Sequence, residues 1–583
     1  MAMAFAGVAL AGEDSKPTDL QRLAATLGTE PLLAVGVQDV HALPERFAGT
    51  HLSQMLNDPA YANGLAALRV LLNQNAGVVL NQFLPKAAKL ITGPVVAAVV
   101  ADGDALSLVV CAVVANEDAA RELNTIWPKA AEDAPDSAPP LFKIMKLKTV
   151  LPKDLPAEDA ALPDWAAKNW PSGDFALTLQ PRKLIKAAEK AVADGKIPGV
   201  APNSDALPLL STIDGSAIER VTLGVAIDGE AFSDELTVEV ASEPDTTFSH
   251  VVNALKEKPK GWDSLLAALP GDGDLAVMFH SDPKALADDL PYAVQGLERY
   301  LRGRRWAVKA GVAPDALDPK RFEFLLDRLH GEVGISVRPS LTAELHLVLA
   351  AAMKSGELDT IRKDLMDGLD GLGAGFETLQ NVSRIGNTAP LGALFQGRGI
   401  FAAPVIGMSP GWAWLCTNLP TYRGLIAAFD AGKTLAAAIK QENARLKAAG
   451  KAELWRPDDA LRVQINLEKI VPLGYTAWLL SGGQPVIGGW QMPPALLPPP
   501  QLLLGHLGTL RIALARNGST LNGYSRCVIP GTSLIGVGLL QGLAAGADRA
   551  KEFAKNPPPP PAERAPIKKR TGDPGDAEPP KEK

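Results

Sequence analysis

The sequence predicts an α+β protein made of four diverged strand-helix-hairpin-helix modules, with mainly antiparallel sheets packed by helices. Three observations support this fold class: strands that alternate apolar and polar residues and turn back as hairpins, a lone apolar strand upstream of each hairpin, and helix signals after these elements. The chain has 583 residues, of which 47% are hydrophobic and 21% charged, so most of its length can form a packed core.

The clearest hairpin runs from Val221 to Val240 and turns at Asp228-Gly229. Both of its arms alternate apolar with polar residues, which predicts one buried side and one side in water. The same plan recurs at three other turns, which are Asp102-Gly103, Arg338-Pro339-Ser340 and Asn517-Gly518. Asn-Gly is the strongest of these turn signals.

A lone apolar strand, here called the lead strand of a module, precedes each hairpin and runs directly into a helix start of Asp, Asn or Pro. The four lead strands are expected at Leu32–Val37, Phe175–Leu179, Leu275–Phe279 and Leu461–Ile465. Three of them follow a Pro-then-Asp segment, at Pro171–Asp174, Pro270–Asp274 and Pro457–Asp459. Tryptophans just before these strands are expected to pack between modules, namely Trp165, Trp170, Trp262 and Trp455.

These signals divide the chain into six parts. A signal-like segment and linker (1–18) is followed by module 1 (19–168), module 2 (169–261), module 3 (262–453, with an insertion at about 376–415), module 4 (454–555) and a tail (556–583). The sequence leaves open whether the modules share one sheet, although the open outer arms of the hairpins favour pairing across modules.

Charge and cysteine content exclude several classes of function. The chain has 58 Lys and Arg against 65 Asp and Glu, a net charge of -7, whereas a domain that follows phosphates carries a basic stripe; no nucleic-acid partner is expected. Cys111, Cys416 and Cys527 are too few and too far apart for a disulfide framework or a tetrahedral zinc site. We therefore expect no cofactor.

The start of the chain predicts export. Met1–Ala11 is wholly apolar and ends in Ala9-Leu10-Ala11, the small-x-small pattern of a signal-peptidase site, although the usual basic residues before the apolar run are missing. A signal peptide and a periplasmic or extracellular location are expected; the alternative is a frayed apolar end.

Two other segments bear on how the mature chain meets its surroundings. Pro94–Ala115 is long enough to span a bilayer, but Asp102 and Asp104 interrupt it, so two buried strands are expected and the mature chain has no predicted transmembrane segment. The Pro-rich, charged residues 556–583 cannot form a core and predict a disordered tail.

One sequence feature resembles half of a metal site. His280 and Asp282 stand two positions apart after a lead strand and are weak candidates as metal ligands, because side chains at i and i+2 of an extended segment share a face. Two ligands do not complete a site, and Asp282 or Ser281 capping the helix that Pro283 opens explains the same residues. No catalytic residue is assigned.

Two further patterns have a structural alternative. Trp412 and Trp414 lie on one face of a short strand and are weak candidates for stacking on a ligand such as a sugar ring, while core packing is the commoner fate of tryptophan. Gly432-Lys433-Thr434 is similar to the end of a phosphate-binding loop, but Ala427 stands where the first glycine of that motif belongs, which favours an ordinary helix start.

The repeated plan resembles large secreted bacterial proteins of unknown function that are built from diverged strand-helix-hairpin-helix units. The resemblance rests on the Pro-then-Asp segments and on hairpins such as Val221–Val240, and it covers most of residues 30–545. The missing Pro-then-Asp segment before Leu32 and the insertion after Leu369 depart from it. The resemblance implies no activity.

Three hypotheses for function follow. The first is a non-enzymatic exported protein that serves as an envelope or extracellular binding or structural scaffold. The second is a periplasmic carrier of an apolar ligand, with Leu496–Leu504 as a flap over half-apolar sheets. The third is a hydrolase whose site is assembled from distant residues. Oligomeric state, ligand and spatial order of the modules are left open.

Overall fold

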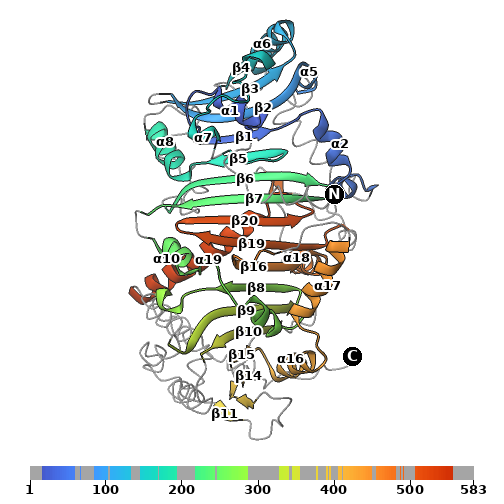
Figure 1. The fold of residues 1–583 in the computed structure, drawn as a ribbon, viewed down its shortest axis with the longest axis vertical. Helices are drawn as coiled ribbons and strands as arrows, with labels where there is room; N and C mark the ends of the chain where they lie inside the picture. Colours follow the sequence, from blue (N-terminus) through green and yellow to red (C-terminus); the bar gives the residue numbers. More distant parts are fainter. Residues whose placement is uncertain are drawn as a thin grey trace, which may run out of the picture.

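The computed structural model describes residues 16–59, 66, 84–102, 105–132, 145–167, 170–193, 217–242, 246–286, 327–339, 345–354, 376–378, 389–391, 393–395, 405–409, 411–448, 455–480, 486–487, 490–491 and 506–555. The predicted signal peptide (1–11), the predicted flap (496–504) and the predicted tail (556–583) lie outside these residues. Figure 1 shows one long sheet with helices on both sides, and the predicted α+β class is confirmed.

The same three-strand unit occurs four times. In each unit a lead strand pairs antiparallel with the first arm of the hairpin that follows it. The units are β1 (Leu33–Val37), β2 (Ile91–Asp102) and β3 (Ala105–Val114); β5 (Phe175–Leu179), β6 (Ile218–Asp228) and β7 (Ala231–Val240); β8 (Leu275–His280), β9 (Leu329–Pro339) and β10 (Leu345–Met353); and β16 (Asp459–Asn466), β19 (Thr509–Asn517) and β20 (Thr520–Cys527). The segment Pro94–Ala115 is thus a hairpin, as predicted.

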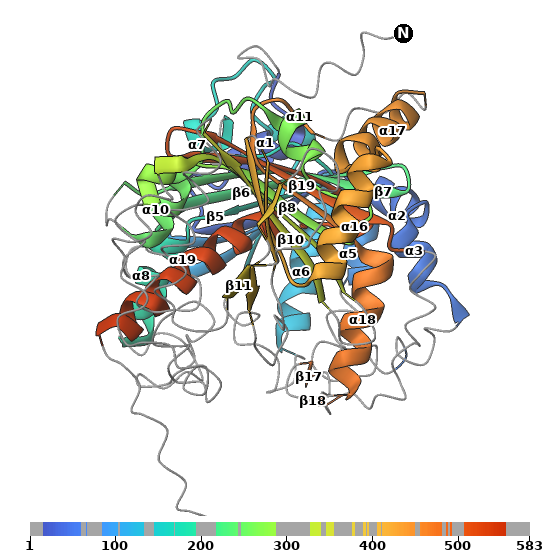
Figure 2. The same ribbon diagram turned by 90° about the horizontal axis from the view of Figure 1, so that it is seen from below.

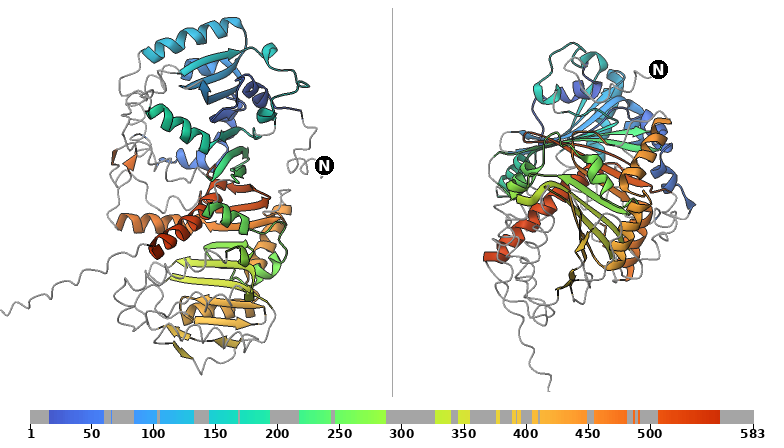
Figure 3. Two further views of the ribbon diagram at one scale, coloured as in Figure 1. Left: turned by 90° about the vertical axis from the view of Figure 1, so that its left-hand side faces the viewer. Right: turned by 60° about the horizontal axis from the view of Figure 1, so that its bottom comes forward.

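The four units join into one sheet of 16 strands. Lead strands pair with each other, β1 with β5 and β8 with β16, and the outer hairpin arms β7 and β20 pair in the middle. The two ends carry extra strands: the parallel β4 (Met145–Val150) beyond β3, and β15 (Trp412–Cys416), β14 (Val405–Ser409) and β12 (Ala389–Leu391) beyond β10. Figure 3 shows how β19 and β20, late in the sequence, lie between the second and third units.

Short strands and helices complete the described chain. Two small sheets pair β11 (Phe376–Thr378) with β13 (Ala393–Phe395) and β17 (Val486–Ile487) with β18 (Trp490–Gln491). The helices are α1 (Asp19–Ala25), α2 (Ala42–Ala48), α3 (His51–Leu56), α5 (Leu84–Leu90), α6 (Glu117–Glu132), α7 (Asp164–Ala167), α8 (Pro181–Ala193), α10 (Thr247–Ala254), α11 (Trp262–Ala267), α16 (Leu419–Asp430), α17 (Leu435–Ala448), α18 (Leu467–Leu480), α19 (Ser533–Lys555) and the 3₁₀ turns η5 (Pro152–Asp154) and η6 (Pro283–Leu286). No helix in the described ranges is long and apolar enough to cross a membrane.

Helices cover the two sides of the sheet differently (Figure 2). On the α19 side, α19 and α10 pack over the middle of the sheet, against buried residues such as Ile512 and Val238. On the other side, here the α17 side, α1 packs on β1–β3, and α11, α16 and α17 pack over β8–β10 and β15. Both ends of the α17 side are therefore covered by helices.

The Pro-then-Asp segments place a buried aspartate at or directly before the start of a lead strand in three modules. The amides of Asp174 and Asp274 donate to the carbonyls of Val225 and Val337 on the paired hairpin arm. Asp174 forms an ion pair with Arg46, Asp274 with Lys469 at 2.8 Å, and Asp459 with Arg462 at 3.1 Å. Module 1, which lacks the segment, has the apolar Leu32 there, and its amide makes the equivalent bond to Val99.

One expectation for the hairpin Val221–Val240 is wrong. Its first arm was expected to have one side in water, but Thr222 and Gly224 on that side are buried. The reason is that the Pro-then-Asp segment of module 2 crosses this strand so closely that a Cβ on Gly224 would lie 2.2 Å from the carbonyl oxygen of Ser172. The second arm does alternate as predicted.

Candidate functional site

The middle of the α17 side is a polar strip on three neighbouring strands. Alternation along the strands turns most apolar residues of β7, β20 and β19 toward α19, together with the buried Asp234 and Ser525, and most of the polar residues to the opposite side. These polar side chains are half-buried or exposed. The strip consists of Ser233, Glu235 and Thr237 on β7, Asn522, Tyr524 and Arg526 on β20, and Thr509 and Arg511 on β19.

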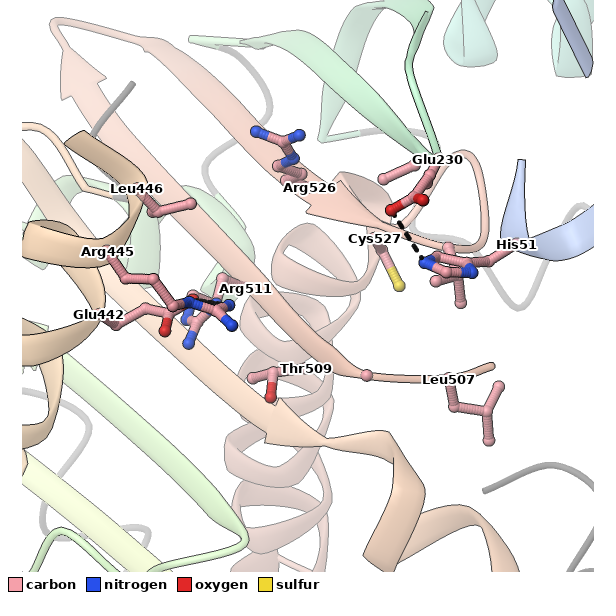
Figure 4. Close-up of a pocket in the computed structure, with 13 residues that line it drawn as sticks. His51, Glu230, Glu442, Arg445, Leu446, Leu507, Thr509, Arg511, Arg526 and Cys527 are labelled. Atoms are coloured by element: carbon pink, nitrogen blue, oxygen red, sulfur yellow. Dashed lines mark hydrogen bonds and ion pairs between the residues drawn. The ribbon is translucent and has the colours of Figure 1, made fainter. Parts of the chain in front are cut away.

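Two hollows open along this strip. The first, here the arginine hollow, has a volume of about 370 Å³ and is drawn in Figure 4. Helix α17 forms one of its walls, and α3 with the β6–β7 turn forms the other. Its lining includes His51, Glu230, Glu442, Arg445, Leu446, Leu507, Thr509, Arg511, Arg526 and Cys527.

Two arginines come from neighbouring strands on the floor of the arginine hollow, and their guanidinium groups reach to opposite flanks, Arg511 toward Gln464 on β16 and Arg526 toward Asp228 on β6. Arg511 and Arg526 are direct register partners of β19 and β20, and their side chains are each 16% exposed. Like charges directly opposite each other on antiparallel strands destabilise the pair. Burial lowers the pKa of Arg511, and Glu442 opposes that effect. The guanidinium nevertheless stays charged because arginine's ordinary pKa is so high.

Carboxylates around the hollow compensate this charge only in part. Glu442 lies 2.8 Å from Arg445 and 3.9 Å from Arg511, so one carboxylate serves two guanidinium groups. Arg511 Nε donates to Gln464 Oε1 at 3.4 Å. Arg526 forms an ion pair of 2.8 Å with Asp228, which is half exposed.

The opposite wall holds a histidine and a cysteine. His51 Nε2 lies 3.4 Å from Glu230 Oε2, the contact dashed in Figure 4, and the His51 amide donates to the Glu230 carbonyl. Burial raises the pKa of the Cys527 thiol, which keeps it protonated and unreactive. Within the described ranges no three His, Cys, Asp or Glu side chains are grouped so that they could hold a metal ion.

The second hollow, here the acidic hollow, has a volume of about 290 Å³ and adjoins the first along β19 and β20. Burial raises the pKa of Glu235, although Arg456 opposes that rise. Burial also raises the pKa of Asp459 to about 6, against the effect of Arg462. Arg456 lies over the Tyr524 ring, 5.3 Å from its centre. Two carboxyl groups with raised pKa values in one hollow are the kind of arrangement that a hydrolase uses.

Hydrogen bonds within the chain explain why Asp459 is buried, so a catalytic role is not needed to account for it. Like Asp174 and Asp274, Asp459 is a buried aspartate at the start of a lead strand, and it accepts from the Arg456 amide at 2.8 Å and from Arg462 Nε at 3.1 Å. The Arg462 guanidinium lies 4.0 Å from the Trp262 ring centre and 5.2 Å from that of Trp455. This group, here the Arg462 cage, joins modules 3 and 4, since Trp262 Nε1 also donates to the Asp459 carbonyl at 2.9 Å.

The two weak metal candidates occupy different environments. His280 is fully buried beside Trp262, with ring centres 4.2 Å apart, and burial lowers its pKa to about 4. Asp282 is exposed, and its carboxylate accepts from the Lys284 amide at 3.0 Å. Asp282 therefore caps η6, which is the capping alternative considered from the sequence.

The tryptophan pair lies on one face of β15, as predicted, but that face is part of the core. Trp414 is buried, its Nε1 donates to the Ala268 carbonyl at 3.0 Å, and Trp412 packs against the same cluster. Core packing therefore explains the pair. Thr434 accepts from the Ala437 amide at 3.4 Å at the start of α17, so the segment that is similar to a phosphate-binding loop is an ordinary helix start.

Sequence reasoning missed Arg511 and Arg526. Both lie in the hairpin that Asn517-Gly518 predicts, on the polar side of its arms. Alternation along the two arms could have placed both arginines on the polar side, but their pairing with each other depends on the type of the turn.

Comparisons with known proteins add little. No family model matches the chain, and no curated protein matches it. Among solved structures the chain is similar to crystal form I of TP0453 at 9% identity and a TM-score of 0.22, over 49% of this chain and 97% of that one. Crystal form IV of TP0453 matches at 10% identity and a TM-score of 0.19, over 48% and 84% of the two chains. At these TM-scores the likeness supports no conclusion about fold or function.

Proposed function

We propose that this protein is a non-enzymatic binding scaffold whose binding surface is the polar strip on the α17 side of the sheet. The observation that carries the proposal is the position of the strip: polar side chains such as Tyr524 and Arg526 fill the middle of a side whose two ends are covered by helices. A surface that only packed against its own chain would be apolar there.

The shape of the strip favours an extended polar ligand. Arg526 and Tyr524 are two residues apart on β20, as are Arg511 and Ala513 on β19, so the two hollows lie about 7 Å apart along the strands. Side chains on the strands of a large sheet keep their positions better than side chains on loops. A chain-like ligand, such as a glycan or a peptide, could lie along β20 and contact both hollows.

Export is the second part of the proposal and rests on Met1–Ala11 alone. It is tested by sequencing the N-terminus of the protein recovered from its own cells by fraction. A mature start at Gly12 outside the cytoplasm would support export, and a retained Met1 in the cytoplasm would contradict it.

Binding is tested on glycan and peptide arrays with the full chain and a variant that blocks the strip. We expect Asn522→Arg, which places a long side chain on the exposed part of the strip, to abolish any array signal. The matched control is Asn253→Arg, an exposed asparagine on α10. No signal with the native chain, or equal signals from the native chain and Asn522→Arg, would contradict the proposal.

A second candidate function, carriage of an apolar ligand, is favoured by the α19 side of modules 1 and 2. Val35 on β1 is 46% exposed there, and its register partners Ala97 and Leu177 are only half-buried. Such a contiguous apolar surface is typical of an interaction site. Native mass spectrometry with fatty acids tests this: Val35→Asp should remove the bound mass, whereas Leu543→Asp, at an exposed leucine of α19, should keep it.

A further inference from the structure

We propose that Arg511 and Arg526 together form the seat for one oxyacid group, a carboxylate, phosphate or sulfate, of the ligand that lies along the polar strip. The inference rests on the proposed function and names the chemistry of its ligand. It starts from the cross-strand register, which makes Arg511 and Arg526 direct partners, so that both guanidinium groups can turn to one ligand group between them.

The first argument is the cost of this pairing to the protein without ligand. Opposite charges across a strand pair stabilise it and like charges destabilise it. The same sheet does use the favourable arrangement: Arg220 on β6 pairs with Glu239 on β7 and lies 3.0 Å from its carboxylate. An anion between Arg511 and Arg526 would convert the unfavourable pair into a favourable one.

The second argument is the number of donors that remain. A guanidinium group has five N–H donors. Within the part of the chain that the structure describes, Arg511 uses one of them for Gln464, and its 3.9 Å distance to Glu442 is too long for a hydrogen bond. Among the described residues, the Arg526 guanidinium has one ion-pair partner, Asp228. Each arginine thus retains donors for the two-pronged contact that guanidinium makes with an oxyacid.

The third argument is space and charge around the seat. A hollow of about 370 Å³ has room for an oxyacid group together with part of the molecule that carries it. Glu442 keeps Arg445 as its partner at 2.8 Å when Arg511 turns to a ligand. Glu230 and Asp228 at the other wall repel a second negative charge. The seat therefore suits one compact anion and rejects a polyanion.

The experiment measures thermal unfolding of the full chain at low ionic strength with added sodium phosphate, sulfate or acetate. Three anions are used because they distinguish which oxyacid the seat prefers. We expect the preferred anion to raise the unfolding temperature of the native chain, and both Arg511→Gln and Arg526→Gln to weaken its apparent affinity at least tenfold. Arg338→Gln, an exposed arginine on β9, is the matched control and should respond as the native chain does.

Two lysine variants show whether the glutamine variants bind the anion more weakly only because they fail to fold. Arg511→Lys and Arg526→Lys keep the charge but lose the planar fork, so they should unfold normally and bind the anion more weakly than the native chain. Equal anion responses in the native chain and all four variants would overturn the proposal, as would no response to any anion.

The outcomes also separate this inference from the proposed function. Anion binding that depends on both arginines, without any array signal, would support the seat and contradict the scaffold. An array signal that Asn522→Arg abolishes but Arg511→Gln and Arg526→Gln leave unchanged would support the scaffold and overturn the seat.

Discussion

Arg462 and the pair Arg511 and Arg526 lie on the same side of the sheet, on neighbouring strands, but the chain compensates their charges differently. Arg462, on β16, is buried between Trp262 and Trp455 with the carboxylate of Asp459 at 3.1 Å. Arg511, on the neighbouring β19, is only half-buried and is the cross-strand register partner of Arg526. The first arginine has every partner that a structural charge needs, and the second shares one carboxylate with Arg445. Compensation of charge by the chain itself therefore distinguishes Arg462 from the arginines of the proposed anion site.

The largest expected effect is loss of the Arg462 cage. Arg462→Ala removes one partner of a buried ion pair and leaves Asp459 buried without a counter-ion, so the free energy of unfolding should fall by about 3 to 5 kcal/mol. Urea unfolding measures it. Arg462→Met combined with Asp459→Leu should recover most of this loss, because no charge is then left buried. An effect below 1 kcal/mol would mean that the cage is not structural.

A smaller effect is expected from pH at His280, which packs on the cage. Its pKa falls from about 6.5 unfolded to about 4 folded, so the unfolded chain binds the proton more readily and stability is lost as pH falls through that window. Between pH 7.5 and 4.5 this amounts to about 2.5 kcal/mol.

The comparison with His280→Leu isolates this contribution. Asp459, with its pKa raised to about 6, has the opposite sign, because its folded form holds the proton more tightly and its contribution falls as pH rises from about 4 to 6. The two trends overlap in the native chain. The difference between the stability curves of the native chain and His280→Leu cancels the Asp459 trend, and a flat difference would contradict the assignment.

For the arginine hollow, a still smaller effect on stability is expected. Arg526→Gln without added anion should change the free energy of unfolding by less than about 1 kcal/mol, because relief of the repulsion from Arg511 offsets loss of the Asp228 pair. Adding 1 M NaCl should screen both the repulsion and the Asp228 pair, so the difference in stability between the native chain and the variant should become smaller still. Urea unfolding at both salt concentrations measures this, and a large loss of stability would make Arg526 another structural arginine.

The smallest change in stability is expected for an exposed ion pair, and it serves as the reference for the larger changes above. Arg338 forms an ion pair with Asp272, and both side chains are at least half exposed. Arg338→Ala should therefore change stability by less than about 0.5 kcal/mol by urea unfolding. A larger value would show that exposed pairs on this sheet are stronger than solvent screening allows.

Much of this fold was predictable because it follows from local rules. Alternation and turn residues located the lead strands and hairpins, and the placement of Trp262 and Trp455 before lead strands predicted their packing between modules. Burial within the sheet was less predictable. His280 and Trp414 have polar atoms that suggest chemistry in a sequence, yet tertiary packing encloses both.

The register of one turn explains why the site escaped prediction. Asn-Gly usually occupies both central positions of a two-residue hairpin, which would pair Arg511 with Tyr524. In the structure the central residues are Gly518 and Ser519, with Gly518 at a φ of 59°, and Arg511 pairs with Arg526. A glycine at the first central position is typical of a type II′ turn. Alternation thus predicts on which side of the sheet Arg511 lies. Which residue of β20 lies opposite Arg511 depends on the type of the turn.

The junction between β7 and β20 also has a consequence for synthesis of the chain. Asp234 on β7 and its partner Ser525 on β20 are 291 residues apart in the sequence. At typical translation rates β7 therefore waits about 15 to 60 s for its neighbour after leaving the ribosome. During that time the first two modules can fold but expose a complete unpaired strand, which is a template for aggregation. Pulse-chase experiments should find the nascent chain associated with a chaperone until residue 527 has emerged.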